Sequence, residues 1–216
     1  MKPRIVPLGD SAVLLQLGDE IDLTINQRVH TLANLITTSA INGIIETVPA
    51  YATLLVYYDS LSLSFTQIKN ILREKLNHIQ ENESRKPRRV EVLVRYGGEL
   101  GPDLEVVAAH LGLRVEDVIR IHSEKIYTVY MMGFTPGYPY KGKLDAALIM
   151  PRLETPRTRV PAGTVAIAGS QTGIYSIDSP GGWNLIGWTP LKLFDPESES
   201  PFLFAPGDEV KFVVQK

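Results

Sequence analysis

The sequence contains no cysteine, which excludes disulfide bonds, thiol nucleophiles and zinc–thiolate sites. It also contains no run of 18 or more apolar residues, so we expect no membrane-spanning helix. The net charge is only −2, which gives no reason to expect nucleic-acid binding. The first residues, MKPRIVPLGD, lack the uninterrupted apolar region of a signal peptide, and we therefore expect a cytoplasmic location.

Metal-binding and serine-nucleophile signatures are also missing. The sequence has no H-x-x-x-H, H-E-x-x-H or G-x-S-x-G motif, so we expect no metal site and no standard serine hydrolase elbow. A catalytic triad formed by residues distant in the sequence stays open. The four histidines are His30, His78, His110 and His122.

The first 80 residues alternate between strand and helix patterns. Thr24–Thr37 and Ser64–Ile79 carry apolar residues at helical spacing, and each starts with Ser or Thr followed three residues later by Gln. This start predicts a capping box on both helices. The expected strands are Arg4–Leu8, Ala12–Leu17, Ile44–Val48 and Thr53–Tyr58. The resulting order, ββαββα, predicts a small α/β sandwich within an overall α+β fold.

The segment Glu81–Arg89, ENESRKPRR, has no aliphatic or aromatic side chain apart from Pro87. We interpret it as an interdomain linker whose cationic residues are solvated, and we place the two domains at residues 1–84 and 85–216. A length of 216 residues is sufficient for two small domains.

The second part of the chain is dominated by a segment rich in glycine and proline. Residues 133–190 contain 9 of the 17 glycines and 7 of the 15 prolines, interleaved with Val, Ile, Leu and both tryptophans. This much core material argues against a disordered linker and favours rigid turns between short strands. A helix is expected before it, at Asp103–Leu111, ended by Gly112.

One apparent nucleotide-binding motif is misleading. Gly137–Lys143, GYPYKGK, satisfies G-x-x-x-x-G-K, but Leu144 stands where a P-loop needs Ser or Thr, and Pro139 has no N–H to offer a phosphate. We therefore expect Lys141 and Lys143 to be exposed surface lysines, with an anion contact as the alternative.

The segment TPRTRVPAG offers the best candidate for anion binding. Arg157 and Arg159 are two residues apart, so on a strand both side chains would point to one face and form a fork for a carboxylate or phosphate. The alternative is that an arginine pairs with a structural acid such as Glu154, Asp145 or Asp178.

A second group of candidates comes from the surrounding glycine-rich motifs. Polar residues beside glycines in SQTGIY and SPGGWN could contact a ligand that approaches the backbone closely, or could satisfy their own turns. Nearby aromatic side chains could line a pocket or pack in the core. The candidates are Gln171, Thr172, Tyr175 and Ser179 for binding, and Tyr138, Tyr140 and Trp183 for the pocket wall.

Five motifs in a fixed order, GF-x-PG-Y-PY, TPRTRVPAG, QTGIY, SPGGW-x-LIG and TPL-x-LFD, resemble one known family. This is the family of the 5-oxoprolinase B subunit, also called the Kip-type kinase inhibitor or allophanate hydrolase subunit 1 family. The resemblance extends over nearly the whole chain and implies a cyclophilin-like β-barrel as the second domain. Trp188 is a departure, since many members have arginine there.

The resemblance implies a non-autonomous component of an ATP-dependent bacterial 5-oxoprolinase, which converts 5-oxoproline to glutamate. It implies the C and A subunits of that enzyme as partners and ATP with Mg as the cofactor, without saying which of the components holds the nucleotide. The same family implies a second possibility, an inhibitor that binds a sporulation sensor histidine kinase. An amide- or urea-type carboxyl-transfer or hydrolase half-domain is a third.

Overall fold

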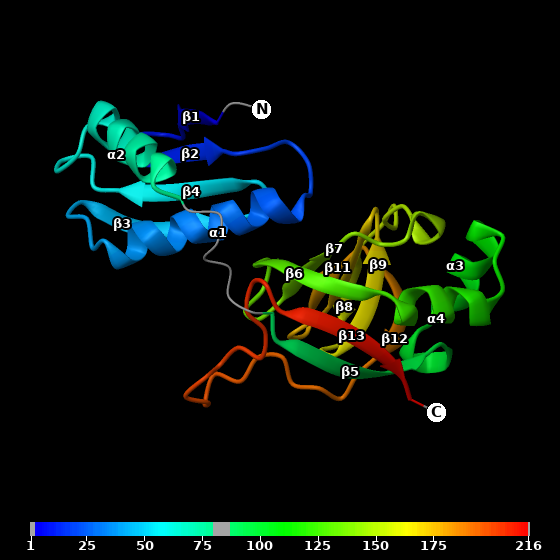
Figure 1. Ribbon diagram of the computed structural model, residues 1–216. Coiled ribbons are helices and arrows are strands. Elements are labelled where there is room, and N and C mark those ends of the chain that lie inside the picture. Colours follow the sequence, from blue (N-terminus) through cyan, green and yellow to red (C-terminus); the bar gives the residue numbers. More distant parts are fainter. Residues whose placement is uncertain (1–2, 80–86, 216) are drawn as a thin grey trace. The chain divides into compact units, whose positions relative to one another are not determined.

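The computed structural model describes residues 3–79 and 87–215 (Figure 1). The chain divides into two compact units, Met1–Lys86 and Pro87–Lys216. The boundary predicted between residues 84 and 85 lies outside the described residues, as do residues 81–86 of the expected linker.

The first unit is built on an antiparallel sheet with the strand order β1-β2-β4-β3. Its strands alternate between buried and more exposed side chains, as expected for a sheet with one covered face. The strands are β1 (Arg4–Pro7), β2 (Ala12–Gln16), β3 (Ile44–Pro49) and β4 (Thr53–Tyr58), and the predicted order of elements is confirmed.

Two helices, α1 (Leu23–Thr38) and α2 (Phe65–Asn77), supply the other half of this core. Leu32 of α1 and Leu72 of α2 belong to the same buried cluster as Leu15 of β2 and Leu54 of β4. Both helices therefore cover the same face of the sheet.

The two helix starts differ from each other. The capping box predicted for α2 is confirmed, because the Ser64 hydroxyl accepts from the Gln67 N–H and the Gln67 side chain accepts from the Ser64 N–H. The one predicted for α1 at Thr24 is wrong. Asp22 caps this helix instead, through Oδ1, which accepts from the Ile25 N–H at 2.9 Å.

The second unit contains a closed barrel with the strand order β10-β7-β6-β13-β5-β12-β9 (Figure 1). β5 and β13 are parallel, whereas the other barrel neighbours are antiparallel. A short ribbon pairs β8 (Arg157–Val160) with β11 (Ser179–Gly181). The barrel strands are β5 (Arg89–Tyr96), β6 (Ile126–Met132), β7 (Pro139–Gly142), β9 (Thr164–Ala168), β10 (Gln171–Ile174), β12 (Asn184–Trp188) and β13 (Glu209–Val214).

Helices α3 (Leu104–Leu111) and α4 (Val115–Glu124) pack together beside the barrel. Their buried side chains join the barrel interior in one apolar cluster. Gly112 ends α3 in the left-handed conformation, with φ of 66°, as the sequence predicts. The remaining helical segments are the short 3-10 turns η1 (Gly98–Leu100) and η2 (Ala146–Leu148).

Arg88 and Arg89, the last residues of the expected linker, are tied to the barrel unit. Arg88 donates to the buried carboxylate of Asp208 at 2.6 Å, and Arg89 at the start of β5 donates to Glu209 at 2.8 Å. The expectation that these cations are merely solvated is therefore wrong for these two arginines, because β5 and β13 run side by side and bring the acids within reach.

No helix within residues 3–79 and 87–215 is long and apolar enough to cross a membrane.

Candidate functional site

An aromatic pocket of about 260 Å³ lies on the barrel unit, where β7, the end of β10 and the ribbon strand β11 meet. Its wall combines aromatic rings, backbone at glycines and one cation. The lining residues are Phe134, Tyr138, Tyr140, Arg152, Pro156, Tyr175, Pro180, Gly181, Gly182 and Trp183.

Tyr138 forms the centre of the aromatic wall. Its ring packs edge-on against Phe134, Tyr175 and Trp183 at centroid distances of 5.6, 5.6 and 6.1 Å, and lies 4.9 Å from the ring of Tyr140. Edge-to-face contacts of this kind fix ring orientations better than aliphatic packing does. The pocket wall is therefore preformed by contacts within the chain.

Glycines in the two neighbouring motifs make room for the tyrosines. A side chain at Gly173 would collide with the hydroxyl of Tyr138, and one at Gly181 would collide with the hydroxyl of Tyr175. These glycines allow the aromatic rings to pack directly against the backbone, and Gly181 is itself part of the pocket wall.

Phe134 forms an exposed edge of the pocket. Its φ is 64°, in the left-handed region that a bulky residue rarely adopts, and its side chain is 60% exposed. The surrounding loop is held by Ser176, whose hydroxyl donates to the Pro136 carbonyl at 2.6 Å and lies 3.1 Å from the Thr135 hydroxyl. A strained backbone conformation that surrounding contacts hold in place is common at ligand-binding sites.

Arg152 brings positive charge to the pocket. Its guanidinium lies 5.9 Å from the Trp183 ring centroid, within the range of a cation–π contact, and its side chain is exposed. Within the described part of the chain it forms no ion pair, so the charge is available to an anionic ligand.

Two pocket tyrosines stay protonated at neutral pH. Burial raises the pKa of Tyr140 and of Tyr175, while the positive charge of Arg152 acts on both in the opposite direction. Neutral hydroxyls can both donate and accept hydrogen bonds. The pocket therefore suits a small, flat ligand with one negative group.

A buried chain of hydrogen bonds occupies the barrel interior. Thr172 donates to the Ala166 carbonyl at 3.3 Å, so we assign the proton of neutral His122 to Nε2, which lies 2.8 Å from the Thr172 hydroxyl. His122 Nδ1 then accepts from the Tyr96 hydroxyl at 2.7 Å. Burial, followed by the charge of Lys141, lowers the pKa of His122 to about 3. His122 is therefore a neutral structural residue that links α4 to the barrel.

Lys141 also lies in this interior, so the expectation that it is exposed is wrong. Its side chain is fully buried on β7 opposite Thr172. Nζ has a 3.4 Å contact to the Pro139 carbonyl and lies 5.8 and 5.7 Å from the ring centroids of Phe204 and Phe212. Lys143, two residues further on, is exposed as expected. The P-loop-like motif Gly137–Lys143 contains strand β7. The short 3-10 turn η2 follows it, whereas a P-loop is followed by an α-helix.

Comparison with known proteins shows the family of this chain. Residues 3–204 match the family described as carboxyltransferase domain, subdomain C and D. The B subunit of the 5-oxoprolinase of Bacillus subtilis (strain 168) is 44% identical, over 97% of this chain and 92% of that protein. The chain belongs to the 5-oxoprolinase B-subunit family. The family resemblance stated from the sequence motifs is thereby confirmed.

Two further relatives show the range of proteins that contain this fold. The crystal structure of TTHA0988 matches with a TM-score of 0.83 and 40% identity, over 95% of this chain and 40% of that one. The urea amidolyase of Lachancea kluyveri is 27% identical, over 94% of this chain and 13% of that protein. In both cases this chain corresponds to less than half of a longer protein.

The two arginines predicted from the sequence, Arg157 and Arg159, each form an ion pair with a carboxylate of this chain. Arg157 donates to Asp103 at 2.7 Å, and the second oxygen of Asp103 accepts from the Leu185 N–H at 2.7 Å. Arg159 donates to Asp178 at 2.6 Å. The expected single fork is therefore split between two carboxylates, and a substrate role for either arginine stays a prediction. Asp178 is one of the acids that the sequence suggests, whereas Asp103 is distant in sequence from its arginine and is not.

The other predicted residues fall into two groups. Tyr138, Tyr140, Tyr175 and Trp183 converge on the aromatic pocket, whereas Gln171, Thr172 and Ser179 are not among its lining residues. Thr172 belongs to the barrel interior, and Ser179 is buried on β11 with no hydrogen-bond partner for its hydroxyl in the described part of the chain. Their roles as ligand-binding residues stay predictions.

Arg152 and Phe134 are the pocket residues that sequence reasoning missed. Arg152 is the first of three arginines in PRLETPRTR, but only the spacing of the other two suggests a shared face on a strand. Phe134 lies within the family motif GFTPGYPY, and its left-handed conformation has no sequence signal because glycine or asparagine is expected there. No group of three His, Cys, Asp or Glu residues that could hold a metal ion occurs among the residues that the structure describes.

Proposed function

We propose that this chain is the B subunit of an ATP-dependent 5-oxoprolinase and that its aromatic pocket contributes to binding of 5-oxoproline. The observation that carries this proposal is the 44% identity to the B subunit of a 5-oxoprolinase over nearly the full length of both chains. The similarity to a urea amidolyase supports a substrate whose reacting carbonyl is bonded to nitrogen.

The chemistry of the pocket fits this substrate. 5-Oxoproline is a small lactam ring that carries one carboxylate, and the pocket of about 260 Å³ offers aromatic faces for the ring and Arg152 for the carboxylate. Tyr140 is half-buried, and its neutral hydroxyl can hydrogen-bond to the lactam amide. In this arrangement the chain binds and orients the substrate and shields one side of its ring from water.

The remaining chemistry is assigned to the companion components of the enzyme. A lactam is stabilised by resonance, and phosphorylation of its carbonyl oxygen by ATP would make the carbon susceptible to attack. We propose that ATP with Mg is held at an interface with the C subunit, or within that protein, because the aromatic pocket is smaller than the usual range for drug-sized ligands. The A subunit would complete the reaction.

The barrel unit is also proposed to be of the cyclophilin-like type and to form a domain of its own. The closed barrel, together with the separate core clusters of the two units, supports both proposals.

Release of ADP that depends on 5-oxoproline tests the proposed function. It would be measured for the chain alone, for the A and C subunits alone, and for the reconstituted complex. Release that requires this chain in the complex is the expected result. A stable complex whose ADP release does not depend on 5-oxoproline would contradict the proposal. Inhibition of a sensor histidine kinase by the chain alone would favour a function as a kinase inhibitor instead.

A further inference from the structure

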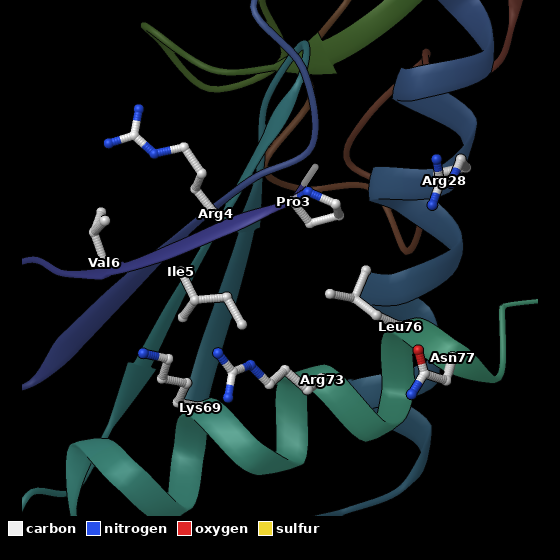
Figure 2. Close-up of a pocket in the computed structure, with 9 residues that line it drawn as sticks. All are labelled: Pro3, Arg4, Ile5, Val6, Arg28, Lys69, Arg73, Leu76 and Asn77. Atoms are coloured by element: carbon white, nitrogen blue, oxygen red, sulfur yellow. The ribbon is translucent and has the colours of Figure 1, made fainter. Parts of the chain in front are cut away.

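A groove of about 740 Å³ runs along the first unit between the edge strand β1 and helix α2 (Figure 2). Its walls are four consecutive residues of the β1 region, two turns of α2 and one residue of α1. The lining residues are Pro3, Arg4, Ile5, Val6, Arg28, Lys69, Arg73, Leu76 and Asn77.

The charge of this groove is of one sign. Arg4 from β1, Arg28 from α1, and Lys69 and Arg73 from α2 line it, and no lining residue is acidic. None of these four cations forms an ion pair with another residue of the described chain. Elsewhere in the protein, exposed arginines such as Arg114 do have carboxylate partners. The groove therefore concentrates uncompensated positive charge.

Two of the cations lie side by side. Lys69 and Arg73 are one helical turn apart, and both side chains extend below Ile5 (Figure 2). Like charges at this spacing destabilise a helix unless a negative group lies between or above them. An anion bound in the groove would remove this cost.

We propose that this groove is a docking surface for an acidic segment of a partner protein. The proposal rests on the proposed function, because the companion components of a 5-oxoprolinase are the partners that such a segment would belong to. The aliphatic side chains of Ile5 and Leu76 provide an apolar strip beside Lys69 and Arg73 (Figure 2), and a segment with alternating acidic and apolar residues would match both features.

A nucleotide fits the groove less well. The lining offers no aromatic ring for a base to stack on and no glycine-rich loop to direct N–H groups at phosphates. Its cations lie on long side chains from three separate elements, which suits an extended partner. Addition of a partner strand to β1 is also disfavoured, because Pro3 and Pro7 flank its three other residues and cannot donate to a ladder.

Charge reversal at Arg73 tests the proposal, with Lys75 as the matched control. Both residues lie on α2, but Lys75 does not line the groove, and Arg73→Glu and Lys75→Glu change the net charge equally. The affinity of each full-length variant for the purified A and C subunits would be measured at about 50 and about 300 mM salt. We expect Arg73→Glu to weaken the association about tenfold or more at low salt and to reduce its salt dependence, because it removes a charge that attracts the partner. Lys75→Glu is expected to associate like the wild type.

Four outcomes separate the alternatives. Equal association of both variants with the wild type would overturn the proposal, as would a failure of the wild-type chain to associate with the A and C subunits. Binding of ATP or tripolyphosphate to the isolated chain that Arg73→Glu abolishes, with association unchanged, would identify a nucleotide as the occupant and also overturn it. A wild-type complex that forms but does not turn over 5-oxoproline would contradict the proposed function. In that case the comparison of Arg73→Glu with Lys75→Glu would still test the docking surface.

Discussion

At the scale of single residues, Lys141 has an environment far from the ordinary one of a lysine. Its amine is enclosed by the barrel core, and its contact to the Pro139 carbonyl is long, at 3.4 Å. Burial lowers the pKa of Lys141 from 10.5 to about 7, since a charge in this interior is poorly solvated. Folding therefore releases a proton from Lys141 between about pH 7 and 10.5, and this contribution makes the protein more stable as the pH rises through that window.

Replacement of Lys141 by methionine tests the free-energy cost of burying its charged amine. We expect Lys141→Met to increase the free energy of unfolding by about 1–3 kcal/mol at pH 6, because methionine fills similar space without a polar group to bury. The gain should shrink from about pH 7 to about pH 10. Urea denaturation at several pH values measures it, with Lys143→Met as an exposed control expected within about 0.5 kcal/mol of the wild type. A Lys141→Met variant that is less stable at pH 6 would show that the amine has a partner or a role of its own.

The two arginines of β8 should differ in their effect on stability. Arg157 is two-thirds buried and holds Asp103, which also accepts from the Leu185 N–H, whereas Arg159 is 77% exposed beside Asp178. Arg157→Ala should reduce the free energy of unfolding by about 1–3 kcal/mol and Arg159→Ala by less than about 1 kcal/mol. Thermal unfolding of both variants measures the difference. Equal, negligible losses would mean that the Asp103 contact is not structural and would favour the predicted ligand-binding role of Arg157.

The residues that could be predicted from the sequence are those whose role depends on local pattern. Gly112 and the Ser64–Gln67 pair follow from capping rules that involve only neighbouring residues. Lys141 and the Asp103–Arg157 pair depend on which strands become neighbours in the barrel, and a single sequence does not specify that.

At the scale of elements, the pocket is made by strands that place glycine opposite tyrosine. Tyr138 precedes β7 and its hydroxyl lies against Gly173 in β10, while the hydroxyl of Tyr175 lies against Gly181 in β11. The aromatic wall is thus a consequence of strand packing and not of a mobile loop. This explains why glycine-rich motifs and aromatic residues occur together in this part of the sequence.

A side chain at Gly173 should therefore damage the pocket through Tyr138. We expect Gly173→Ala to reduce stability by about 1–3 kcal/mol, the usual cost of overpacking. In a Tyr138→Phe background the loss should be smaller, because part of the collision is with the hydroxyl. A double-mutant cycle by urea denaturation gives the coupling, expected to be at least about 0.5 kcal/mol. Additive effects would mean that the backbone shifts and leaves Tyr138 in place.

Elements with strong periodicity could be predicted well, while the arrangement of the short strands could not. The helices and strands of the first unit lie within one or two residues of their expected bounds, because their apolar spacing distinguishes helix from strand. The strands β7 to β12 have three to five residues each, which is too short for periodicity to show which face is buried. The barrel therefore follows from the family resemblance, and the ribbon of β8 and β11 from the structure alone.

At the scale of the whole molecule, the two units carry different surface features. The barrel unit holds an aromatic pocket with one cation at its edge, and the first unit carries a groove with four cations. Membership in the 5-oxoprolinase B-subunit family gives these features a common context, in which we propose that the pocket binds substrate and the groove binds a partner. Neither task requires this chain to complete the reaction alone.

The most direct test of this division is the dependence of turnover on 5-oxoproline in a reconstituted complex that carries Arg152→Gln. If Arg152 binds the substrate carboxylate, the KM for 5-oxoproline should rise about 10- to 100-fold, as expected for loss of a hydrogen bond between charged groups, with a smaller change in kcat. Arg114→Gln, which alters an exposed arginine outside the pocket, should leave KM near the wild-type value. An unchanged KM for Arg152→Gln, or an equal increase for Arg114→Gln, would contradict the placement of the substrate in the aromatic pocket.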